Sequence, residues 1–459
     1  MTDFHIRLAV DIGGTFTDAV LEKDGVYATE KLLTTPAFPA QGFLTAAMKV
    51  LEATGTQPSD VELIIHGTTL ATNALIEQKG AKTALIVTEG HRDSLEIAFE
   101  NRFDQYDIDA HRSPPLVPRH FLLPVTERMN WRGAILIPLD EGSVEALIPE
   151  IERQEIESVA IGLLHAYANP NHEKRIKEIL RAALPDLFIS LSSEVCPEIR
   201  EYDRQSTTCA NAYIQPLMAR YLEDVRESLA ESGFSCPCLI MTSGGSLVTI
   251  DTATDFPVRL LESGPAGGAI LACSIARQLG ENRVISFDMG GTTAKICLID
   301  NGAPLLSRSF EVNRAHRFMK GSGMPVKVPV VEMVEIGAGG GSIAGVDNLG
   351  RINVGPESAG AEPGPACYGL GGERATVTDA NVLLGRIEPE GFAGGTMTLD
   401  ANAAAAAITR DVGVAMVLDT SAAALGVAVL SEAEWRASNQ GLSMFEGTFQ
   451  IAVPELAGP

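Results

Sequence analysis

The feature that most constrains this chain is a short motif that occurs twice, far apart in the sequence. Residues 10–18 read Val-Asp-Ile-Gly-Gly-Thr-Phe-Thr-Asp, and residues 287–295 read Phe-Asp-Met-Gly-Gly-Thr-Thr-Ala-Lys. Each copy follows a short apolar run, so the pattern predicts a buried strand, an Asp at its end, a two-glycine turn and a second strand. A single copy is equally compatible with an ordinary β-hairpin. Two copies in one chain are much harder to explain in that way.

The residue types of the motif suit phosphate and magnesium. Glycine lets backbone N–H groups approach a ligand without a Cβ in the way. A turn of such N–H groups can hold phosphate oxygens, and Thr hydroxyls add donors. A carboxylate at the strand end is a hard-oxygen partner for Mg²⁺, commonly through the retained waters of the metal. The paired motifs resemble the two phosphate loops of the superfamily that contains actin, sugar kinases and heat-shock chaperone ATPases. That resemblance implies two α/β lobes that close over ATP.

Composition restricts the partners and the compartment. The 459 residues suit two or three domains, and 35 Lys plus Arg against 59 Asp plus Glu give a formal net charge of −24. This charge argues against nucleic acid and anionic membranes as partners, so a phosphate site has to be built locally. Seven scattered cysteines form no disulfide framework, and Cys236-Pro237-Cys238 lacks the second pair that a zinc site would need. With neither a signal peptide nor a long apolar run in the sequence, we expect a cytoplasmic protein.

Alternation of strands and helices predicts an α/β fold with parallel strands. The predicted strands are 5–10, 18–21, 26–33, 61–65, 82–87, 158–164, 187–191, 238–242, 284–287 and 449–453, and the predicted helices are 41–53, 71–78, 170–183, 206–231, 262–279, 401–409 and 421–438. Residues 99–130 are aromatic, charged and Pro-rich, which indicates an irregular excursion, whereas the Gly-rich stretch 301–375 alternates with apolar residues and favours ordered β-hairpins. We therefore divide the chain into a first lobe at 1–200, a second lobe at 201–400 with the β-rich insertion, and a short atypical segment at 401–459.

Six ordered blocks then narrow the resemblance to one family. They are VDIGGTFTDAV, HGTTLATNALIEQKGAKTALIVTEGHRD, SSEVCPEIREYDRQSTTCANAYIQP, LLESGPAGGA, FDMGGTTAK and GAEPGPACYGLGG, between about residues 6 and 387. Together they resemble the hydantoinase A/oxoprolinase family. The resemblance implies an ATP- and Mg²⁺-dependent subunit that phosphorylates a cyclic amide for ring opening and works with a B-type partner subunit. The acetone carboxylase branch of the family, which activates bicarbonate, is the alternative enzyme.

The resemblance also assigns roles to residues of the two motifs. Asp11 and Asp288 are the catalytic and Mg²⁺-binding carboxylates, and phosphate is held by Gly13, Gly14, Thr15, Gly290, Gly291 and Thr292, with Thr17 and Thr293 as further contacts. For Asp18 a hydrogen bond within the hairpin is as good an interpretation as a metal contact.

Two further segments have both functional and structural interpretations. His66, Thr68 and Thr69 follow a strand and precede a helix, where α/β sheets place ligands. They are candidate substrate contacts, and the alternative is a helix cap with a histidine that is hydrogen-bonded internally. Glu262–Gly268 opens a helix of small residues, and our main interpretation there is close packing between the two lobes.

The C-terminal part departs from the family pattern. No Gly-Gly pair follows a strand after residue 387, and the residues from about 412 on match the family poorly. We therefore expect a shortened chain with an incomplete second lobe, a weak adenosine pocket and apolar surface exposed on helix 262–279. A truncated, non-catalytic subunit is the alternative outside enzymes.

Overall fold

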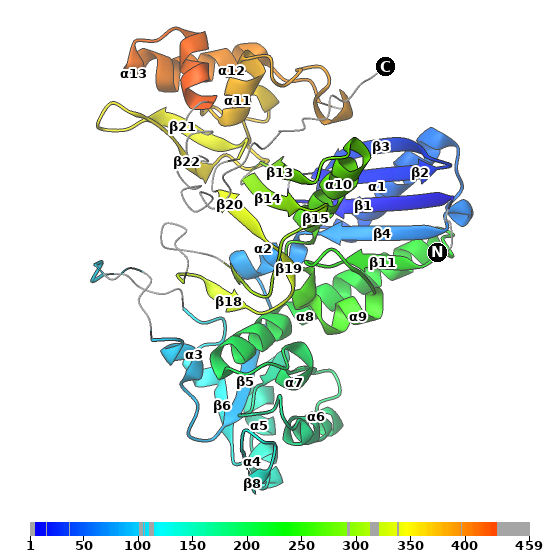
Figure 1. Cartoon of the computed structure of the whole chain (residues 1–459), viewed down its shortest axis with the longest axis vertical. Coiled ribbons are helices and arrows are strands. Elements are labelled where there is room, and N and C mark those ends of the chain that lie inside the picture. The colour runs from blue at the N-terminus through cyan, green and yellow to red at the C-terminus, as the bar shows by residue number, and fades with distance from the viewer. Residues whose placement is uncertain are drawn as a thin grey trace.

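The computed structural model describes residues 5–14, 16–35, 37–100, 104, 106–109, 114–291, 294–312, 321–336, 339–395 and 397–428. These residues form an α/β protein, which confirms the predicted fold class (Figure 1). The assignment to two actin-like lobes, the second incomplete, stays a prediction. Three predicted phosphate contacts, Thr15, Thr292 and Thr293, lie outside the described residues, as does the predicted last strand at 449–453.

The first of the two Asp-x-Gly-Gly-Thr motifs is built into a six-stranded sheet of order β12-β11-β4-β1-β2-β3. Its strands are β1 (Ile6–Ile12), β2 (Phe16–Lys23), β3 (Val26–Leu33), β4 (Leu63–Thr68), β11 (Cys238–Met241) and β12 (Leu247–Thr249). β1 to β3 form the predicted antiparallel meander, while β4 and β11 run parallel to β1 and β4 respectively. β11 and β12 come from the stretch after residue 200, so this sheet draws on both sides of the predicted domain division, which itself stays a prediction.

Alternation along β1 separates a core face from a site face. Leu8, Val10 and Ile12 are buried in the main core with α1 (Pro39–Thr54), whereas Asp11 points to the opposite face. The remaining short elements around this sheet are η1 (Pro58–Asp60), α2 (Leu70–Ile76), α9 (Ile250–Asp255) and η3 (Pro257–Leu260).

A second, four-stranded sheet of order β10-β9-β5-β6 is entirely parallel. Its strands are β5 (Thr83–Thr88), β6 (Leu122–Val125), β9 (Ser158–Ile161) and β10 (Phe188–Leu191). Around the sheet lie the β-hairpin of β7 (Arg128–Met129) and β8 (Ile135–Ile137) and the helical elements α3 (Ser94–Ile97), η2 (Arg119–Phe121), α4 (Glu141–Glu145), α5 (Ile148–Arg153), α6 (Asn171–Ala183) and α7 (Ser192–Val195). The irregular excursion predicted at 99–130 therefore contains a regular strand, β6. Pro124 obscured this strand in the sequence, but a proline is tolerated because β6 is at the sheet edge.

The 31-residue helix α8 (Glu201–Glu231) packs against both sheets. It contacts α1 and α2 on one side and β9 and β10 on the other, and Figure 1 shows it between the two sheets. Contact with the loop before β5 is so close that a Cβ on Gly80 would lie 2.2 Å from the ring of Tyr213. The helix starts five residues earlier than predicted, at Glu201.

The second motif lies in a smaller sheet formed by β13 (Arg283–Met289), β14 (Ala294–Asp300), β15 (Ala303–Pro304) and β20 (Met333–Ile336). Helix α10 (Ser263–Leu279) contacts this sheet and also β4 and β11, whereas the predicted packing of this small-residue helix between two lobes stays a prediction. In the described part of the insertion, antiparallel pairs form as the expectation of ordered β-structure required: β17 (Phe310–Val312) with β18 (Met324–Val326), β21 (Ser342–Val346) with β22 (Ile352–Ser358), and β16 (Leu306–Ser307) with β19 (Val330–Val331), which are not consecutive strands.

A C-terminal helical layer packs on the β21–β22 hairpin, at the opposite end of the molecule from the four-stranded sheet (Figure 1). It comprises η4 (Ala366–Tyr368), α11 (Val377–Leu383), η5 (Phe392–Gly395), α12 (Ala401–Ile408), a π-helical turn (Thr409–Gly413), α13 (Val414–Met416) and a helical segment at 420–428. Among the described residues no single helix is long and apolar enough to cross a membrane, although one bent pair, 401–416 with 420–428, passes by length and composition.

Candidate functional site

The first hairpin is held by its own backbone and by threonine hydroxyls. The N–H of Gly13 donates to the carbonyl of Phe16 at 2.9 Å, and the Thr34 hydroxyl donates to the carbonyl of Gly13 at 2.9 Å. Thr17 is buried, and its hydroxyl lies 3.2 Å from that of Thr34, so it supports the turn from inside. Gly14 is exposed, and a Cβ there would meet nothing closer than the Asn73 side chain at 3.8 Å. Packing in the free protein therefore does not require a glycine at 14.

A glycine-rich segment lies against the second hairpin. The N–H groups of Gly340 and Gly341 donate to the carbonyls of Gly290 and Gly291 at 2.9 and 2.6 Å. A Cβ on Gly341 would lie 2.9 Å from the Gly291 carbonyl oxygen, so only a glycine allows this approach. From the sequence we predicted β-hairpins in the glycine-rich region and did not identify it as a partner of the second hairpin. The density of glycines was the available signal.

Asp11 is the half-buried carboxylate at the centre of the candidate site. Glycines surround it, because a Cβ on Gly67 would lie 2.5 Å from its Oδ1 and a Cβ on Gly264 would lie 3.3 Å from its Oδ2. In the described part of the chain, Oδ1 is buried without a hydrogen-bond partner. Burial, followed by the charges of Asp18 and Asp288, raises the pKa of Asp11 from 3.8 to about 6, against an opposing effect of Lys31. Asp288, from the second hairpin, is thus close enough to act on Asp11.

Asp18 takes the structural role that the sequence left open. It lies directly across the β1–β2 pair from Asp11, and its carboxylate accepts from Lys31 Nζ at 2.6 Å. This bond joins β2 to β3 within the meander, which matches the alternative interpretation as a hairpin contact.

The N-terminus of α10 links β4 and α2 to the second hairpin. Its Ser263 hydroxyl donates to the Thr68 carbonyl at 3.1 Å, and the N–H of Glu262 donates to the Thr72 hydroxyl at 3.1 Å. The Glu262 carboxylate forms an ion pair with Lys295, the residue directly across the β13–β14 pair from Asp288. Glu262 holds a left-handed backbone, φ 61°, which is strained for a residue with a side chain. Sequence reasoning did not select Glu262 or Lys295 as site residues.

The His66 ring is hydrogen-bonded inside the protein. It is fully buried, with Nδ1 2.9 Å from the Val10 carbonyl and Nε2 2.6 Å from the Tyr221 hydroxyl. Burial lowers its pKa to about 4, so the ring is neutral near pH 7. Both ring nitrogens are occupied inside the protein, which is the alternative left open by the sequence, and we leave His66 out of the proposed site.

Thr68 and Thr69 stand at the start of α2, where Thr69 holds the N-cap position without a side-chain cap bond. The Thr68 hydroxyl accepts from the N–H of Leu70 at 3.2 Å, and Thr69 donates its N–H and its hydroxyl to the Ile12 carbonyl at 2.9 and 3.2 Å. Thr68 is fully buried, whereas Thr69 is part-exposed next to the first hairpin. Thr69 therefore stays the better placed of the two for a ligand.

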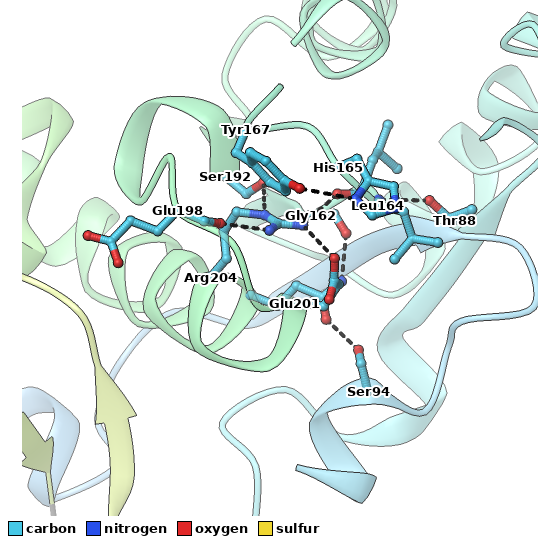
Figure 2. A network of polar contacts seen from close by, with 12 residues as sticks. Thr88, Ser94, Gly162, Leu164, His165, Tyr167, Ser192, Glu198, Glu201 and Arg204 are labelled. Atoms are coloured by element: carbon cyan, nitrogen blue, oxygen red, sulfur yellow. Dashed lines mark hydrogen bonds and ion pairs between the residues drawn. The ribbon is translucent and has the colours of Figure 1, made fainter. Parts of the chain in front are cut away.

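A second polar cluster surrounds Arg204, at the ends of β9 and β10 (Figure 2). The buried guanidinium donates to the Ser192 hydroxyl at 3.2 Å and to the carbonyls of Glu198 and Leu163 at 2.9 Å each, with the Glu201 carboxylate 3.7 Å away. A satisfied buried network of this kind rigidifies a structure. We assign it to holding the start of α8 on the four-stranded sheet.

The described residues contain no group of three or more His, Cys, Asp or Glu side chains that could hold a metal ion. A magnesium ion does not need such a cage, because it is commonly held by one or two carboxylates together with waters and substrate phosphates. An unpartnered buried oxygen on Asp11, with Asp288 nearby, fits that kind of site.

Two family patterns match most of the chain. The sequence pattern described as Hydantoinase/oxoprolinase matches residues 204–434, and that of the Hydantoinase/oxoprolinase N-terminal region matches 7–184. The match thus extends past residue 387, where the ordered motif blocks end, and past 412, where the sequence predicted a poor match.

Three relatives are similar along most of this chain. The caprolactamase subunit alpha of Pseudomonas jessenii is 38% identical over 99% of this chain and 64% of its own length. An uncharacterized protein of Methanocaldococcus jannaschii is 40% identical over 88% of this chain and 60% of its own length. The crystal structure of the caprolactamase superposes with a TM-score of 0.79 at 36% identity, covering 95% of this chain and 63% of the solved one. A nucleotide-free structure of acetone carboxylase superposes with a TM-score of 0.80 at 26% identity, and the match covers 97% of this chain and 64% of the solved one.

The chain therefore spans a little under two thirds of the length of these relatives. Identity of this level over nearly the whole sequence, together with matches to both family patterns, establishes the relationship. This chain belongs to the hydantoinase/oxoprolinase family.

Proposed function

We propose that this chain is the ATP-using subunit of an amidohydrolase that opens a small cyclic amide. The observation that carries the proposal is the position of the Asp11 carboxylate, which lies against Gly67 of β4 and Gly264 of α10. The charge of Asp288 on the second hairpin raises the pKa of Asp11 on the first, and Oδ1 of Asp11 is buried without a partner in the described part of the chain. A pair of carboxylates in such surroundings is typical of a site that binds a cation.

In this proposal the two hairpins are the phosphate loops of two actin-like lobes. The phosphate-binding residues are Gly13, Gly14, Thr15, Gly290, Gly291 and Thr292, with Thr17 and Thr293 supporting them, and the Mg²⁺-binding residues are Asp11 and Asp288. The exposed, unobstructed Gly14 supports close approach of phosphate, and the N-terminus of the 17-residue helix α10, beside Asp11, adds a positive dipole end.

The chemistry explains why such a site would serve an amidohydrolase. An amide carbon is a poor electrophile, and ATP supplies the phosphoryl group that makes the amide oxygen a better leaving group while Mg²⁺ neutralises charge. The chain itself would position the reactants and stabilise the charge that develops in phosphoryl transfer. Asp11 and Asp288 would orient the metal, and the link through Glu262 and Lys295 would fix the distance between the hairpins.

A B-type partner subunit is part of the proposal, because the Pseudomonas jessenii relative is named as the alpha subunit of its caprolactamase. The specific alternative is a carboxylase-type subunit that activates bicarbonate, which the similarity to acetone carboxylase favours. A non-catalytic subunit is the third possibility, and it predicts that the hairpins bind no ATP.

The test is ATP turnover by the purified chain, with and without a co-purified B-type subunit, on a panel of hydantoins and lactams. The proposal predicts Mg²⁺-dependent turnover that a cyclic amide stimulates. Turnover that depends on bicarbonate and a ketone instead would support the carboxylase alternative. Absence of turnover, together with absence of ATP binding, would support the non-catalytic subunit.

A further inference from the structure

The segment GAEPGPACYGLGG, residues 360–372, is one of the six family blocks and has no role in the site described so far. It contains η4 and precedes α11, so it belongs to the C-terminal helical layer. This layer contacts both hairpins, through backbone hydrogen bonds at the second and through aromatic rings at the first. The segment therefore lies on a connection between the two Gly-Gly turns.

At the second hairpin the connection is made by the backbone. The Gly290 carbonyl accepts from the N–H of Gly340 at 2.9 Å, and the Gly340 carbonyl accepts from the N–H of Thr378, in the first turn of α11, at 2.8 Å. A Cβ on Gly340 would lie 2.7 Å from the Thr378 hydroxyl oxygen, so this close approach requires a glycine. The start of α11 is thus joined to the second Gly-Gly turn through one intervening residue.

The buried Asp379 fixes η4 on the start of α11. Its carboxylate accepts from the N–H of Cys367 at 2.8 Å. The side chains of Tyr368 and Thr378 are also hydrogen-bonded to each other. The Tyr368 ring packs so closely on the preceding loop that a Cβ on Gly364 would lie 2.8 Å from it. These contacts give the Tyr368 ring a fixed position relative to α11.

At the first hairpin the connection is made by aromatic rings. Phe392, at the start of η5, packs against both Tyr368 and Phe16, with ring centroids 5.5 and 6.0 Å away. Phe16 opens β2 directly after the turn, and its carbonyl accepts from the N–H of Gly13. Lys31 Nζ lies 4.7 Å from the centre of the Phe16 ring. The aromatic cluster of Phe16, Phe392 and Tyr368 thus ends on the residue that closes the first Gly-Gly turn.

We propose that Tyr368 and Phe392 are positioning residues that hold the first Gly-Gly turn at a set distance from the second. The route runs from the second turn through Gly340, α11 and η4 to the aromatic cluster, and it is separate from the route through the N-terminus of α10. A ligand that bridges both turns binds more tightly when that distance is set beforehand, because ordering the turns on binding costs free energy. The inference rests on the proposed function only in taking a chain of phosphates as that ligand.

The first test measures the distance between the hairpins without any ligand. Spin labels at Tyr27 of β3 and Ala303 of β15, both exposed, report on the two sheets that carry the turns. They are attached through encoded ketone side chains, because the chain contains seven cysteines. Phe392→Ala should broaden the distance distribution measured by double electron–electron resonance. Phe392→Tyr keeps the ring and should give the wild-type distribution.

A control separates positioning from a general loss of packing. Leu399→Ala removes a buried side chain from the core cluster against which Tyr368 and Phe392 pack, but one outside the aromatic cluster. It should lower stability and leave the distance distribution unchanged. If Phe392→Ala does not fold, Phe392→Leu, which removes the ring and keeps an apolar side chain, takes its place. A Phe392 variant without the ring that keeps the wild-type distribution, or a Leu399→Ala distribution equally broad, would overturn the proposal.

The second test measures the affinity of the same variants for Mg²⁺-tripolyphosphate by calorimetry. Phe392→Ala should bind about tenfold more weakly than the wild type, whereas Phe392→Tyr and Leu399→Ala should stay within about twofold of it. The two measurements keep this inference apart from the proposed function. If the distances respond as described and the wild type binds no tripolyphosphate, the positioning role stands and the ATP-dependent function fails. If the wild type binds tripolyphosphate and Phe392→Ala binds it equally well, the positioning role is overturned.

Discussion

Two neighbouring residues of the sheet show how differently a buried titratable group can be used. In the parallel pairing of β1 with β4, Val10 lies opposite His66 and Asp11 lies opposite Gly67. The His66 ring is satisfied by the protein on both nitrogens, whereas Oδ1 of Asp11 has no partner in the described part of the chain. The sequence placed both in the candidate site because both stand at a strand end. The difference between them depends on contacts across the fold, because the Tyr221 hydroxyl that satisfies Nε2 of His66 comes from 155 residues away.

The raised pKa of Asp11 gives a pH dependence of stability. A carboxyl whose pKa rises from 3.8 in the unfolded chain to about 6 in the folded one contributes stability that is complete below pH 3.8 and is lost as the pH rises through about 6. The loss amounts to about 3 kcal/mol. Asp11→Asn should remove it, so the free energy of unfolding of the wild type, in metal-free buffer, should fall relative to the variant between pH 4 and pH 6. Denaturant titrations across that range measure both free energies. If the difference between the wild type and Asp11→Asn did not change with pH, the assignment would be contradicted.

The internal role of His66 predicts a loss of stability rather than of ligand binding. His66→Leu should leave the Tyr221 hydroxyl and the Val10 carbonyl without this partner, at about 1–3 kcal/mol for each unsatisfied group. Tyr221→Phe removes one of the two bonds and should be milder. Chemical denaturation measures both effects. A His66→Leu protein of unchanged stability that failed to bind substrate would show that the ring faces the ligand after all.

Two glycines should respond in opposite ways to the same methyl group. Gly67→Ala would bring a Cβ to within 2.5 Å of Oδ1 of Asp11, so the carboxylate or the strand must shift, and both stability and Mg²⁺-tripolyphosphate affinity should fall. Gly14→Ala has open space, with no atom closer than 3.8 Å, and its stability should stay within about 0.5 kcal/mol of the wild type. Thermal unfolding separates the two, and equal losses of stability would contradict this description of the turn.

Among the elements, helix α10 is one that joins the first sheet to the second hairpin. Its first residues bond to β4 and α2 on one side, and its N-cap residue Glu262 pairs with Lys295 of β14 on the other. The ends of α10 and of the strands before both glycine turns could be predicted to within a few residues, because apolar periodicity and glycine turns are local signals.

Long-range pairings could not be predicted. β11 joins the first sheet from residue 238, β6 forms an edge strand that contains a proline, and Gly340 and Gly341 close on the second hairpin. Each of these depends on which distant segment lies alongside, and the sequence pattern of a single segment does not specify its neighbour. The Glu262–Lys295 pair was missed for the same reason, since 33 residues separate its members.

The link through α10 predicts a defect in coupling. Lys295→Met leaves Glu262 without its cation and removes the positive charge across from Asp288, so Mg²⁺-tripolyphosphate affinity should fall by about tenfold in a folded protein. Glu262→Gln should give a smaller loss, because the amide can still accept from Lys295. The control Glu281→Gln alters a carboxylate just past the far end of the same helix. Calorimetry on the three variants would contradict the role of the link if all three bound like the wild type.

At the scale of the whole molecule, α8 and α10 hold separate sheets in a fixed relation, with the C-terminal helices at one end and the parallel sheet at the other (Figure 1). Apolar side chains are exposed on α10 and β13, as the sequence predicted for helix 262–279: Ile270, Leu271, Leu279 and Phe287. Exposed apolar surface of this extent marks a place where another chain or segment can pack.

The central claim is that both hairpins bind one chain of phosphates through Asp11 and Asp288. Its most direct test is a calorimetric titration of the purified chain with Mg²⁺-tripolyphosphate, which presents the phosphates without adenosine, against Asp288→Asn and the control Asp300→Asn on the adjacent strand. We predict that the wild type and Asp300→Asn bind alike and that Asp288→Asn loses at least about tenfold in affinity while staying folded. Binding to Asp288→Asn that equals the wild type would contradict the shared site.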